Sequence, residues 1–565
     1  MNNIELKLPE SWKILAIWFI LLILGFSVYV NALNGYFVWD DEILVQRNMA
    51  IRGLSGIPNL FTQDMSGNRQ DVYSYGFYRP LVMAVYAIGY SFSGLDVQVY
   101  HFINILMHIL TTLSICFLVY LLFGNYLTAL LCGLLFLIHP VHVEAVTYIS
   151  GLADPLSAFF ILWSFIFYIE YLKSGRKLLY IFLLISYILA LFSKENSLIF
   201  PVILLLYHWA FKVKYKIKQF FPILLLVLLY LFFRANFLKS TLPHTDIMQW
   251  MHLLKRIPGF LAAIINYLRI LFLPFDLHME YGNKLFHFLD LRVIIGTMFS
   301  IGLLVYAFLK RNKNALFFFS VFWFFITLLP CSSIYPINAF YMAEHWLYLP
   351  SIGFFIIISK GLTDLYEHKK LKPLGIILIL ALSTAYSYLT IKQNNYWEDP
   401  LNFYKTTLRY APRSARIYNN LGRLYYYSGK YNQAAEMYKD AIKFGPKESH
   451  IYNNLGLVYE SLNNPKEAIE AFKKAIEMNP EYSLAYNNLG AYYERLGRYN
   501  ETIYMCKKAV EIDPSYSQAY YNLALAYFRI RQYQLAIEYC DKALKLNYKP
   551  AQGLAEVLKP YRDKK

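Results

Sequence analysis

The chain has 565 residues, of which 57% are hydrophobic, 18% aromatic and 16% charged. In a soluble globular protein about a quarter of the residues are charged, so this composition argues against a soluble protein. The net charge of +17 would suit nucleic-acid binding. However, much of that charge lies in short loops between apolar segments, which is typical of membrane topology. The composition therefore favours a membrane protein and argues against a nucleic-acid partner.

Eleven segments are apolar enough to be predicted as membrane-spanning helices, which need about 20 apolar residues each. Segment 257–275 is also apolar, but it contains Arg269 and is expected to be broken by Pro258 and Pro274. We interpret it as an interfacial or re-entrant element, because counting it as a span would violate the charge rule that sets orientation. The predicted spans are 12–31, 99–122, 125–139, 155–173, 177–193, 197–213, 219–235, 291–309, 314–330, 346–360 and 373–391.

The basic loops between these segments predict the orientation. Loops 173–177, 212–218, 310–313 and 368–372 are rich in Lys and Arg, and all four fall on one side of the predicted bundle. That side is expected to be cytoplasmic. The N-terminus is then inside, and the odd number of spans places the C-terminal region outside. The loops expected on the outer side are 32–98, 139–154, 193–197, 236–290 and 331–345.

The C-terminal segment, residues 412–565, repeats with a period of 34 residues. Prolines recur at 412, 446, 480 and 514, and tyrosines at 418, 452, 486 and 520. The small and aromatic positions of each unit resemble the tetratricopeptide repeat, in which two antiparallel helices pack closely and proline ends the unit. The sequence predicts an α-solenoid of four such repeats. Segment 396–411 is expected to be a connecting half-repeat, after a membrane domain at 1–395.

Acidic residues directly follow the first predicted span. Asp40, Asp41 and Glu42 are flanked by aromatic residues, and charge next to hydrocarbon is costly unless it has a use. One carboxylate of the pair is a candidate general base. The alternative is a solvated loop start or a helix cap.

The other predicted outer loops carry cations and further acids. Arg79 is a candidate phosphate ligand or a lipid-headgroup anchor. Lys194 and Glu195 follow one another at a helix end and are expected to pair with each other unless they serve a site. His101 and His108 share a helix face, which favours hydrogen bonding between helices over metal ligation.

A dense polar patch lies in the loop 139–154. His139, His142 and Glu144 have the spacing of no standard metal site, and the patch fits better as the wall of a substrate site. Glu344 and His345 lead into a later predicted span. Acids and cations from several loops are therefore expected to meet at one membrane face.

Six motifs in this order resemble the transmembrane O-mannosyltransferases with tetratricopeptide repeats and their bacterial and archaeal relatives. The resemblance covers nearly the whole chain. The motifs are FVWDDEILV, FYRPL, YHFINILMH, HPVHVEAVTYISGLADPL, FSKENSL and AEHWLYLPS.

The resemblance implies an all-α polytopic bundle with the C-type glycosyltransferase fold and about eleven spans. It also implies transfer of a hexose, mannose or a similar sugar, from a polyprenyl-phosphate donor to an acceptor hydroxyl on the non-cytosolic side, with inversion. In this scheme Asp40 or Asp41 deprotonates the acceptor. The expected donor-phosphate ligands are Arg79, Lys194, His139 and His345, and the expected substrate-pocket residues are His142, Glu144, Glu195 and Glu344.

Two points of chemistry qualify this scheme. Where many relatives have Glu-Arg, this chain has Glu344-His345, and histidine is a weaker and pH-dependent phosphate partner. These residues require no metal or other cofactor, although a divalent ion bridging Asp40 or Asp41 to the phosphate is compatible with them.

Each repeat carries an asparagine at its sixth position: Asn420, Asn454, Asn488 and Asn522. This position is expected to face the concave groove, where carboxamides can bind an extended peptide backbone whatever its sequence. It resembles the asparagine ladder of soluble O-linked sugar transferases. The alternative is that these side chains satisfy the helix ends between repeats.

The leading hypothesis is thus a membrane glycosyltransferase that acts on a protein or peptide acceptor held by the repeats. The competing hypothesis is a non-catalytic scaffold whose repeats recruit partners for envelope or polysaccharide assembly. A third is transfer to a lipid or glycan, with the repeats serving only assembly. Short loops and a compact repeat array favour a prokaryotic inner membrane over an endoplasmic reticulum membrane.

Overall fold

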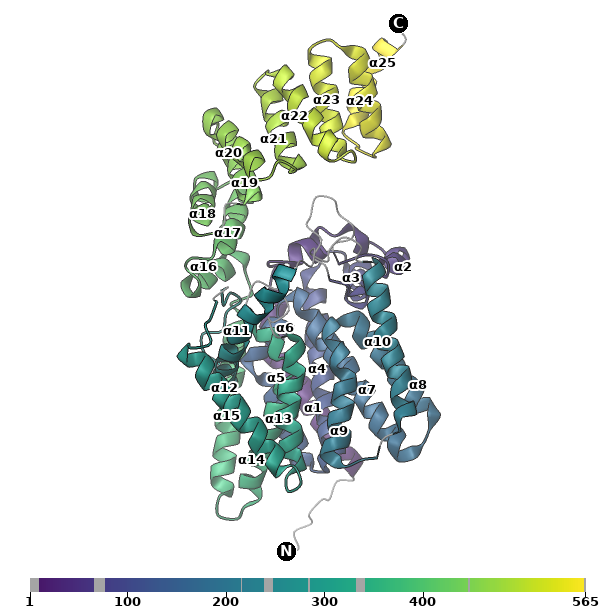
Figure 1. Cartoon of the computed structure of the whole chain (residues 1–565), viewed down its shortest axis with the longest axis vertical. Coiled ribbons are helices and arrows are strands. Elements are labelled where there is room, and N and C mark those ends of the chain that lie inside the picture. The colour runs from purple at the N-terminus through teal and green to yellow at the C-terminus, as the bar shows by residue number, and fades with distance from the viewer. Residues whose placement is uncertain are drawn as a thin grey trace, which may run out of the picture. The chain divides into compact units, whose positions relative to one another are not determined.

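The computed structural model describes residues 10–65, 77–214, 216–237, 247–282, 285–331, 341–445 and 448–562, with backbone only at 10–17, 237 and 247–254. Within these ranges every regular element is a helix, so the predicted all-α class is confirmed. The chain forms two compact units, Met1–Thr406 and Thr407–Lys565 (Figure 1).

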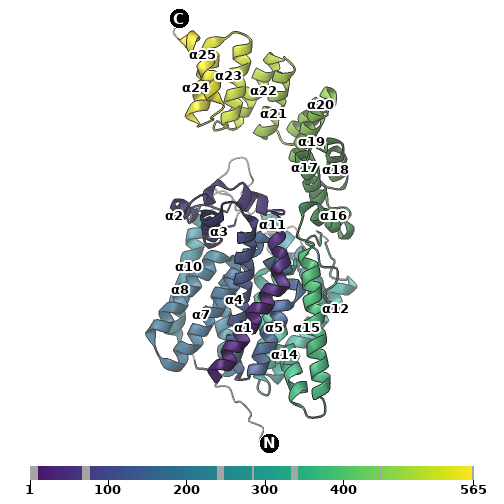
Figure 2. The ribbon, with the colours of Figure 1, turned by 180° about the vertical axis from the view of Figure 1, so that it is seen from behind.

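The first unit is a bundle of long apolar helices. Each of the eleven predicted apolar segments overlaps a helix of the structure, although the helix predicted at 346–360 begins only at Ser351. Figure 2 shows α1 beside α4, α5 and α15, which it contacts. The helices of this unit are α1 (Glu10–Tyr29), α2 (Ile57–Leu60), α3 (Pro80–Ser93), α4 (Val97–Phe123), α5 (Tyr126–Ile138), α6 (Val143–Val146), α7 (Ala153–Ser174), α8 (Lys177–Ser193), α9 (Phe200–Phe211), α10 (Ile217–Phe237), α11 (Ile247–Phe272), α12 (Leu291–Lys310), α13 (Ala315–Leu328), α14 (Ser351–Glu367), α15 (Lys372–Asn394) and the first part of α16 (Pro400–Tyr410), which continues into the second unit.

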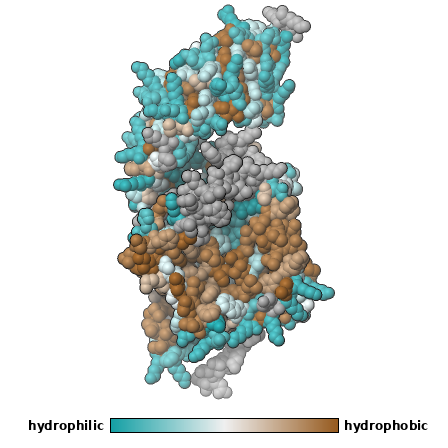
Figure 3. All heavy atoms as spheres, viewed as in Figure 1, coloured by the Kyte–Doolittle hydropathy of each residue, from teal (hydrophilic) through white to brown (hydrophobic). Residues whose placement is uncertain are grey.

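Several of these helices are long and apolar enough to cross a membrane. Within the described residues five meet that standard of length and composition, and a sixth does so if α5 and the helical turn after it, bent by 55°, form one span. Hydrophobic residues cover much of the face of the bundle that is visible in Figure 3. The chain is therefore a membrane protein, while the count of eleven spans stays a prediction. The five are Val97–Phe123, Ile149–Ser174, Ile217–Asn236, Leu291–Lys310 and Lys372–Asn394.

The expected break at Pro258 is wrong. Helix α11 runs through Pro258 and ends at Phe272, just before Pro274. A proline inside a helix removes one backbone hydrogen bond, and the remaining turns of this 26-residue helix continue past it. The interfacial or re-entrant character of 257–275 stays a prediction.

The first long loop is anchored to α3 by a buried apolar cluster. Val45 and Ile51 of the loop are fully buried with Val82 and Ala87 of α3. Burying an aliphatic side chain of this size contributes about 1.5–3 kcal/mol. The loop that carries Asp40 and Asp41 is therefore anchored to α3 by this apolar cluster.

The second unit consists of helical hairpins. The four predicted repeats are four helix pairs, so the solenoid is confirmed, and a further helix packs Leu554 and Leu558 against the last pair. The predicted repeat boundary at Pro446 lies outside the described residues. The helices are α17 (Ala415–Tyr427), α18 (Tyr431–Phe444), α19 (Ser449–Ser461), α20 (Pro465–Met478), α21 (Ser483–Arg495), α22 (Tyr499–Ile512), α23 (Ser517–Arg529), α24 (Tyr533–Lys545) and α25 (Ala551–Arg562).

Gly456 shows why the repeats require a small residue between their helices. A Cβ atom at Gly456 would lie 2.6 Å from the Cε1 atom of Phe472, and Phe472 is fully buried. The ring therefore has no space into which it can retreat.

Replacing Gly456 by Ala is expected to destabilise the repeat unit by about 1–3 kcal/mol, because overpacking outweighs the gain in helix propensity. Thermal unfolding of the full chain in detergent measures the effect. Gly553→Ala in α25 is the matched control, since a Cβ there meets nothing within 4 Å. A Gly456→Ala chain as stable as the control would contradict this packing argument.

Candidate functional site

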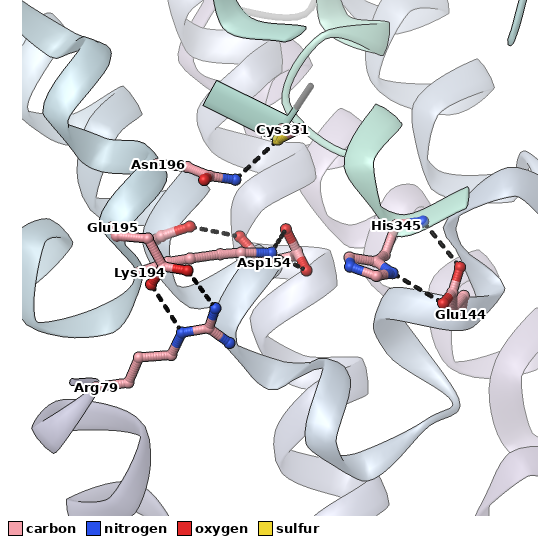
Figure 4. A network of polar contacts seen from close by, with 9 residues as sticks. Arg79, Glu144, Asp154, Lys194, Glu195, Asn196, Cys331 and His345 are labelled. Atoms are coloured by element: carbon pink, nitrogen blue, oxygen red, sulfur yellow. Dashed lines mark hydrogen bonds and ion pairs between the residues drawn. The ribbon is translucent and has the colours of Figure 1, made fainter. Parts of the chain in front are cut away.

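The loops at one end of the bundle bring together most of the predicted site residues. Asp41 lies in the loop after α1, Glu144 in α6, Glu195 in the loop after α8, and His345 just before α14. Figure 4 shows that the side chains of the last three lie in one region, with those of Arg79 and Lys194. The expected convergence of acids and cations from separate loops is therefore observed.

Asp41 is held by three hydrogen bonds. The backbone N–H and the hydroxyl of Ser150 donate to Asp41 Oδ1 at 2.8 and 2.5 Å, and the backbone N–H of Val38 donates to Asp41 Oδ2 at 3.1 Å. The side chain is 1% exposed. Asp41 thus ties the first loop to the loop that follows α5.

Asp40 has a different environment. It is half-buried, whereas Asp41 is buried, and its backbone N–H donates to the Tyr148 hydroxyl at 3.2 Å. The preceding residue, Trp39, has a φ of 59°, a left-handed conformation that is unusual for a bulky side chain and costs about 1–3 kcal/mol. Asp40 is thus more exposed than Asp41, whose carboxylate holds the loop.

Burial raises the pKa of Asp41 to about 7, although the hydrogen bonds from Ser150 and Val38 oppose this shift. The negative charge of Asp40 adds a smaller upward contribution to the same pKa. Asp41 consequently changes its charge near neutral pH, and its two forms differ in how many donors they can accept.

Two ion pairs bind the α3, α7 and α8 regions together. Arg79 donates two hydrogen bonds to Glu195, from Nε at 3.0 Å and from Nη2 at 2.6 Å. Lys194 Nζ donates to both oxygens of Asp154 at 2.7 and 2.8 Å. The expected pair between Lys194 and Glu195 is therefore wrong, because consecutive side chains point in different directions and reach different helices (Figure 4).

The charge environment of Glu195 reflects this pairing. Burial alone would raise the pKa of its carboxyl, but the Arg79 guanidinium, and next Lys194, lower it to about 2. Burial opposes the charged form of Arg79 as well, yet the pKa of Arg79 is raised by the carboxylates of Glu195 and Asp154. Both partners therefore stay ionised at neutral pH.

A third pair joins α6 to the segment before α14. His345 donates its backbone N–H to Glu144 Oε2 at 2.9 Å, and its Nδ1 lies 2.8 Å from Glu144 Oε1. The neighbouring Glu344 Oε1 accepts from the His278 backbone N–H and the Tyr281 hydroxyl, both at 2.6 Å. Burial, and next the Glu144 carboxylate, raise the pKa of Glu344 well above its usual range.

The histidines of the loop 139–154 lie among aromatic rings. His139 and His142 are fully buried, and the His139 ring is 4.4 Å from that of Tyr386 while the His142 ring is 4.1 Å from that of Phe136. His139 Nε2 bonds the Leu271 carbonyl at 3.1 Å. These surroundings differ from those of Arg79 and Lys194, so the roles predicted for His139 and His142 stay predictions.

Of the two histidines of α4, His108 makes contacts of the expected interhelical kind, whereas neither ring nitrogen of the buried His101 has a hydrogen-bond partner among the described residues. His108 Nδ1 lies 2.7 Å from the Tyr348 hydroxyl, and its Nε2 lies 3.1 Å from the Leu137 carbonyl. In the described part of the chain no group of three or more His, Cys, Asp or Glu residues could hold a metal ion.

Sequence reasoning missed several residues that complete this region. Asp154, Ser150 and Tyr281 each bond a predicted site residue. Asp154 and Ser150 lie in the polar patch 139–154, which the sequence already indicated as part of a site. Tyr281 has no local pattern that would have indicated its contact with Glu344.

The asparagines of the repeats form a chain of contacts between repeats. Asn488 Nδ2 donates to Asn453 Oδ1 at 3.0 Å, and Asn522 Nδ2 donates to Asn487 Oδ1 at 2.9 Å. The corresponding bond from Asn454 to Asn419 is 3.4 Å long, as is the bond from Asn419 to Asn420. These bonds link side chains of neighbouring repeats and not the helix ends that the alternative named, and peptide binding at these positions stays a prediction.

Lys194 and Asp154 offer a direct test of this charge network, because their side chains are only 7% and 9% exposed. Asp154→Ala is expected to lower the free energy of unfolding by about 3–5 kcal/mol, since it leaves Lys194 as an uncompensated buried charge. Thermal unfolding in detergent measures this change.

Two further chains complete that test. The double variant Asp154→Leu with Lys194→Met should recover most of the loss, because it leaves no charge behind. Glu170→Ala is the matched control, since its bond to Lys173 is 3.2 Å long at an exposed pair and should contribute at most about 1 kcal/mol. Equal effects of Asp154→Ala and Glu170→Ala would contradict the buried-pair argument.

Fold and site together define a helical membrane protein with matched charges at one end of its bundle and a solenoid of tetratricopeptide repeats. The family model described as Tetratricopeptide repeat matches residues 450–482, 483–516 and 517–547, and the model described as TPR repeat matches 422–463.

The chain is homologous to proteins named protein O-mannosyl-transferase. It is 27% identical over 427 residues to Protein O-mannosyl-transferase F38B6.6 of Caenorhabditis elegans, covering 72% of this chain and 59% of that protein. It is 26% identical over 478 residues to Protein O-mannosyl-transferase TMTC4 of Homo sapiens, covering 74% of this chain and 64% of that protein. The resemblance predicted from the six motifs is thus confirmed.

The matches thus span less than two thirds of the length of either relative. Among solved structures, a crystal structure of MamA is 29% identical and covers 27% of this chain and 90% of its own, with a TM-score of 0.25.

Proposed function

We propose that this chain is an inverting membrane glycosyltransferase that moves a hexose, mannose or a close analogue, from a polyprenyl-phosphate donor to a protein or peptide hydroxyl. The reaction takes place on the non-cytosolic side of a prokaryotic inner membrane, with the N-terminus in the cytoplasm. The names of the relatives support the protein acceptor and the sugar. The observation that carries the proposal is the half-buried Asp40 on a loop fixed by Asp41, at the end of the bundle where Arg79 and Lys194 also lie.

Asp40 is the proposed general base. Its carboxylate takes the proton from the acceptor hydroxyl as the oxygen attacks the anomeric carbon of the donor. The bond from that carbon to the phosphate oxygen breaks, and the departing phosphate carries the negative charge away. Asp40 is half-buried and can be reached by a substrate, whereas Asp41 is buried.

Arg79 and Lys194 are the proposed contacts of the departing phosphate. Fixed cations aimed at the developing charge stabilise the transition state more than the ground state. Each cation is already oriented by a carboxylate at 3.0 Å or less, so little reorganisation is needed when the donor arrives. No step in this scheme requires a metal. A divalent ion that bridges Asp40 or Asp41 to the phosphate would be an alternative means of neutralising the departing charge.

The repeats are the proposed acceptor-binding part. The side chains of Asn420, Asn454 and Asn488 are half-buried, and a carboxamide offers two N–H groups and a carbonyl oxygen. An asparagine that donates one N–H to the preceding repeat keeps its second N–H and its carbonyl oxygen for a peptide backbone.

The substitution Asp40→Asn is expected to lower sugar transfer by at least about 100-fold, because general-base catalysis contributes 10²–10⁴-fold. Transfer from labelled polyprenyl-phosphate mannose to a peptide panel, by the full chain in lipid, measures it. Glu42→Gln is the matched control on the same loop. A chain in which Asp40→Asn leaves any detected transfer unchanged contradicts the assigned base.

The same assay separates the transferase from the scaffold. A wild-type chain that transfers no sugar to any acceptor, yet still captures partners through its repeats, would favour the scaffold hypothesis.

Transfer should also depend on pH through Asp41. Because the pKa of Asp41 is raised to about 7, its ionised form, which accepts all three hydrogen bonds and fixes the loop, is lost as the pH falls. We expect kcat to decline as the pH falls from about 8 to 6. In Asp41→Asn this limb of the kcat profile should be absent, and a limb that persists there would contradict the assignment.

A further inference from the structure

Five aromatic residues gather where the loop after α1 meets the segment that joins α15 to α16. They come from three parts of the chain, which are the first loop, the loop after α5 and the region 396–404, and each of them is at most 8% exposed. We call this cluster the aromatic clamp, and its members are Trp39, Tyr148, Trp397, Phe403 and Tyr404.

Two rings of the clamp contact the residue that precedes Asp40. The ring of Trp39 lies 6.1 Å from that of Phe403 and 6.0 Å from that of Tyr404, measured between centroids. Trp39 has a φ of 59°, and a bulky residue keeps such a conformation only where its surroundings hold it. The two ring contacts from α16, together with the burial of the indole, provide that restraint next to Asp40.

A third ring contacts Asp40 itself. The Tyr148 hydroxyl accepts a hydrogen bond from the backbone N–H of Asp40 at 3.2 Å. The ring of Tyr148 stacks on that of Trp397, with 5.0 Å between the centroids and 22° between the planes. The ring of Trp397 in turn lies 4.8 Å from that of Phe403. The loop that carries Asp40 is therefore joined to Phe403 by two separate chains of ring contacts.

The segment that supports the clamp is itself held by hydrogen bonds. At the end of α15, Asn394 Nδ2 donates to the Val28 carbonyl at 3.0 Å, and Asn394 Oδ1 accepts from the Thr147 hydroxyl at 2.8 Å. The Glu398 carbonyl accepts from the backbone N–H of Tyr36 at 2.9 Å. These bonds tie the segment before α16 to α1, to the end of α6 and to the first loop.

The place of a general base limits how well it works. Proton transfer requires the base to lie within hydrogen-bond reach of the acceptor hydroxyl, and a displacement of about 1 Å can lower the rate 10²-fold. Contacts that hold the backbone of Asp40 therefore bear on catalysis even when they touch no substrate.

We propose that Trp39, Tyr148 and Phe403 are positioning residues that act through Asp40, so that sugar transfer depends on side chains of the connecting helix α16. This inference rests on the proposed role of Asp40 as general base. The segment 396–411, expected from the sequence to be a connecting half-repeat, thereby gains a part in the reaction. Because the clamp acts on the base and not on substrate binding, its loss should lower kcat and leave KM unchanged.

Two measurements on the full chain in lipid nanodiscs test the proposal. One is hydrogen exchange at the backbone amides of residues 36–44, and the other is kcat and KM for transfer from labelled polyprenyl-phosphate mannose to a peptide. The substitution Phe403→Leu removes the ring and keeps an apolar side chain. Exchange at 36–44 is expected to become about two- to tenfold faster, as for the loss of one aromatic pair. The value of kcat is expected to fall roughly 10- to 100-fold, with KM unchanged.

Substitutions on the loop side separate the ring from the backbone. Trp39→Asn removes the ring but tolerates a positive φ, so it should behave as Phe403→Leu does. Trp39→Phe keeps a ring and should restore most of kcat. Tyr148→Phe keeps the stack on Trp397 and removes only the acceptor of the Asp40 N–H, so exchange should become faster at that amide.

Phe319→Leu in α13 is the matched control, because Phe319 is also fully buried and its ring packs on that of Trp323 at 5.6 Å. It should leave both kcat and the exchange at 36–44 as in the wild type. Equal effects of Phe319→Leu and Phe403→Leu would overturn the proposal, because they would reflect a general loosening of the bundle. Wild-type exchange and kcat in Phe403→Leu and Trp39→Asn would overturn it as well, and so would a rise in KM without a fall in kcat.

The exchange readout stands apart from transfer. A wild-type chain that transfers no sugar, while exchange at 36–44 still becomes faster in Phe403→Leu and Trp39→Asn, contradicts the transferase proposal and supports the clamp as the restraint on this loop.

Discussion

The arrangement at the end of the bundle depends on the matching of buried charges. The side chains of Lys194 and Asp154 are 7% and 9% exposed, and an unpaired charge at such a position costs several kcal/mol. The loop after α8 must therefore meet the start of α7, and through Glu195 it must also meet Arg79 at the start of α3. Asp41 applies the same constraint to the first loop. The position of Asp40 is thus set by the contacts of Asp41 and by the ion pairs that hold the neighbouring loops.

The sequence was sufficient for the features that repeat or extend over many residues. A run of about 20 apolar residues can satisfy its backbone in a membrane only as a helix, and each of the eleven predicted segments overlaps a helix of the structure. The 34-residue period likewise predicted four helical hairpins. Pro258 does not end α11, because the other turns of this helix keep it continuous past a single missing hydrogen bond.

The pairing of side chains was much less predictable. Lys194 and Glu195 are neighbours in sequence, and nothing local says that one reaches Asp154 and the other Arg79, which lie 40 and 116 residues away. The contact between Tyr281 and Glu344 depends on how the segment after α11 folds back. Such contacts are set by tertiary packing, so the sequence predicted which loops would meet but not which atoms.

The repeats show that a structural and a recognition role need not exclude one another. The sequence left two alternatives for the sixth-position asparagines, satisfying the helix ends between repeats or binding a peptide. The structure shows Asn488 and Asn522 each donating to the asparagine 35 positions earlier. A carboxamide can make four hydrogen bonds, through two N–H groups and two lone pairs, and one such bond uses only one of them. It also fixes the rotation of the side chain, so a peptide backbone would meet a carboxamide that has already lost its rotational entropy.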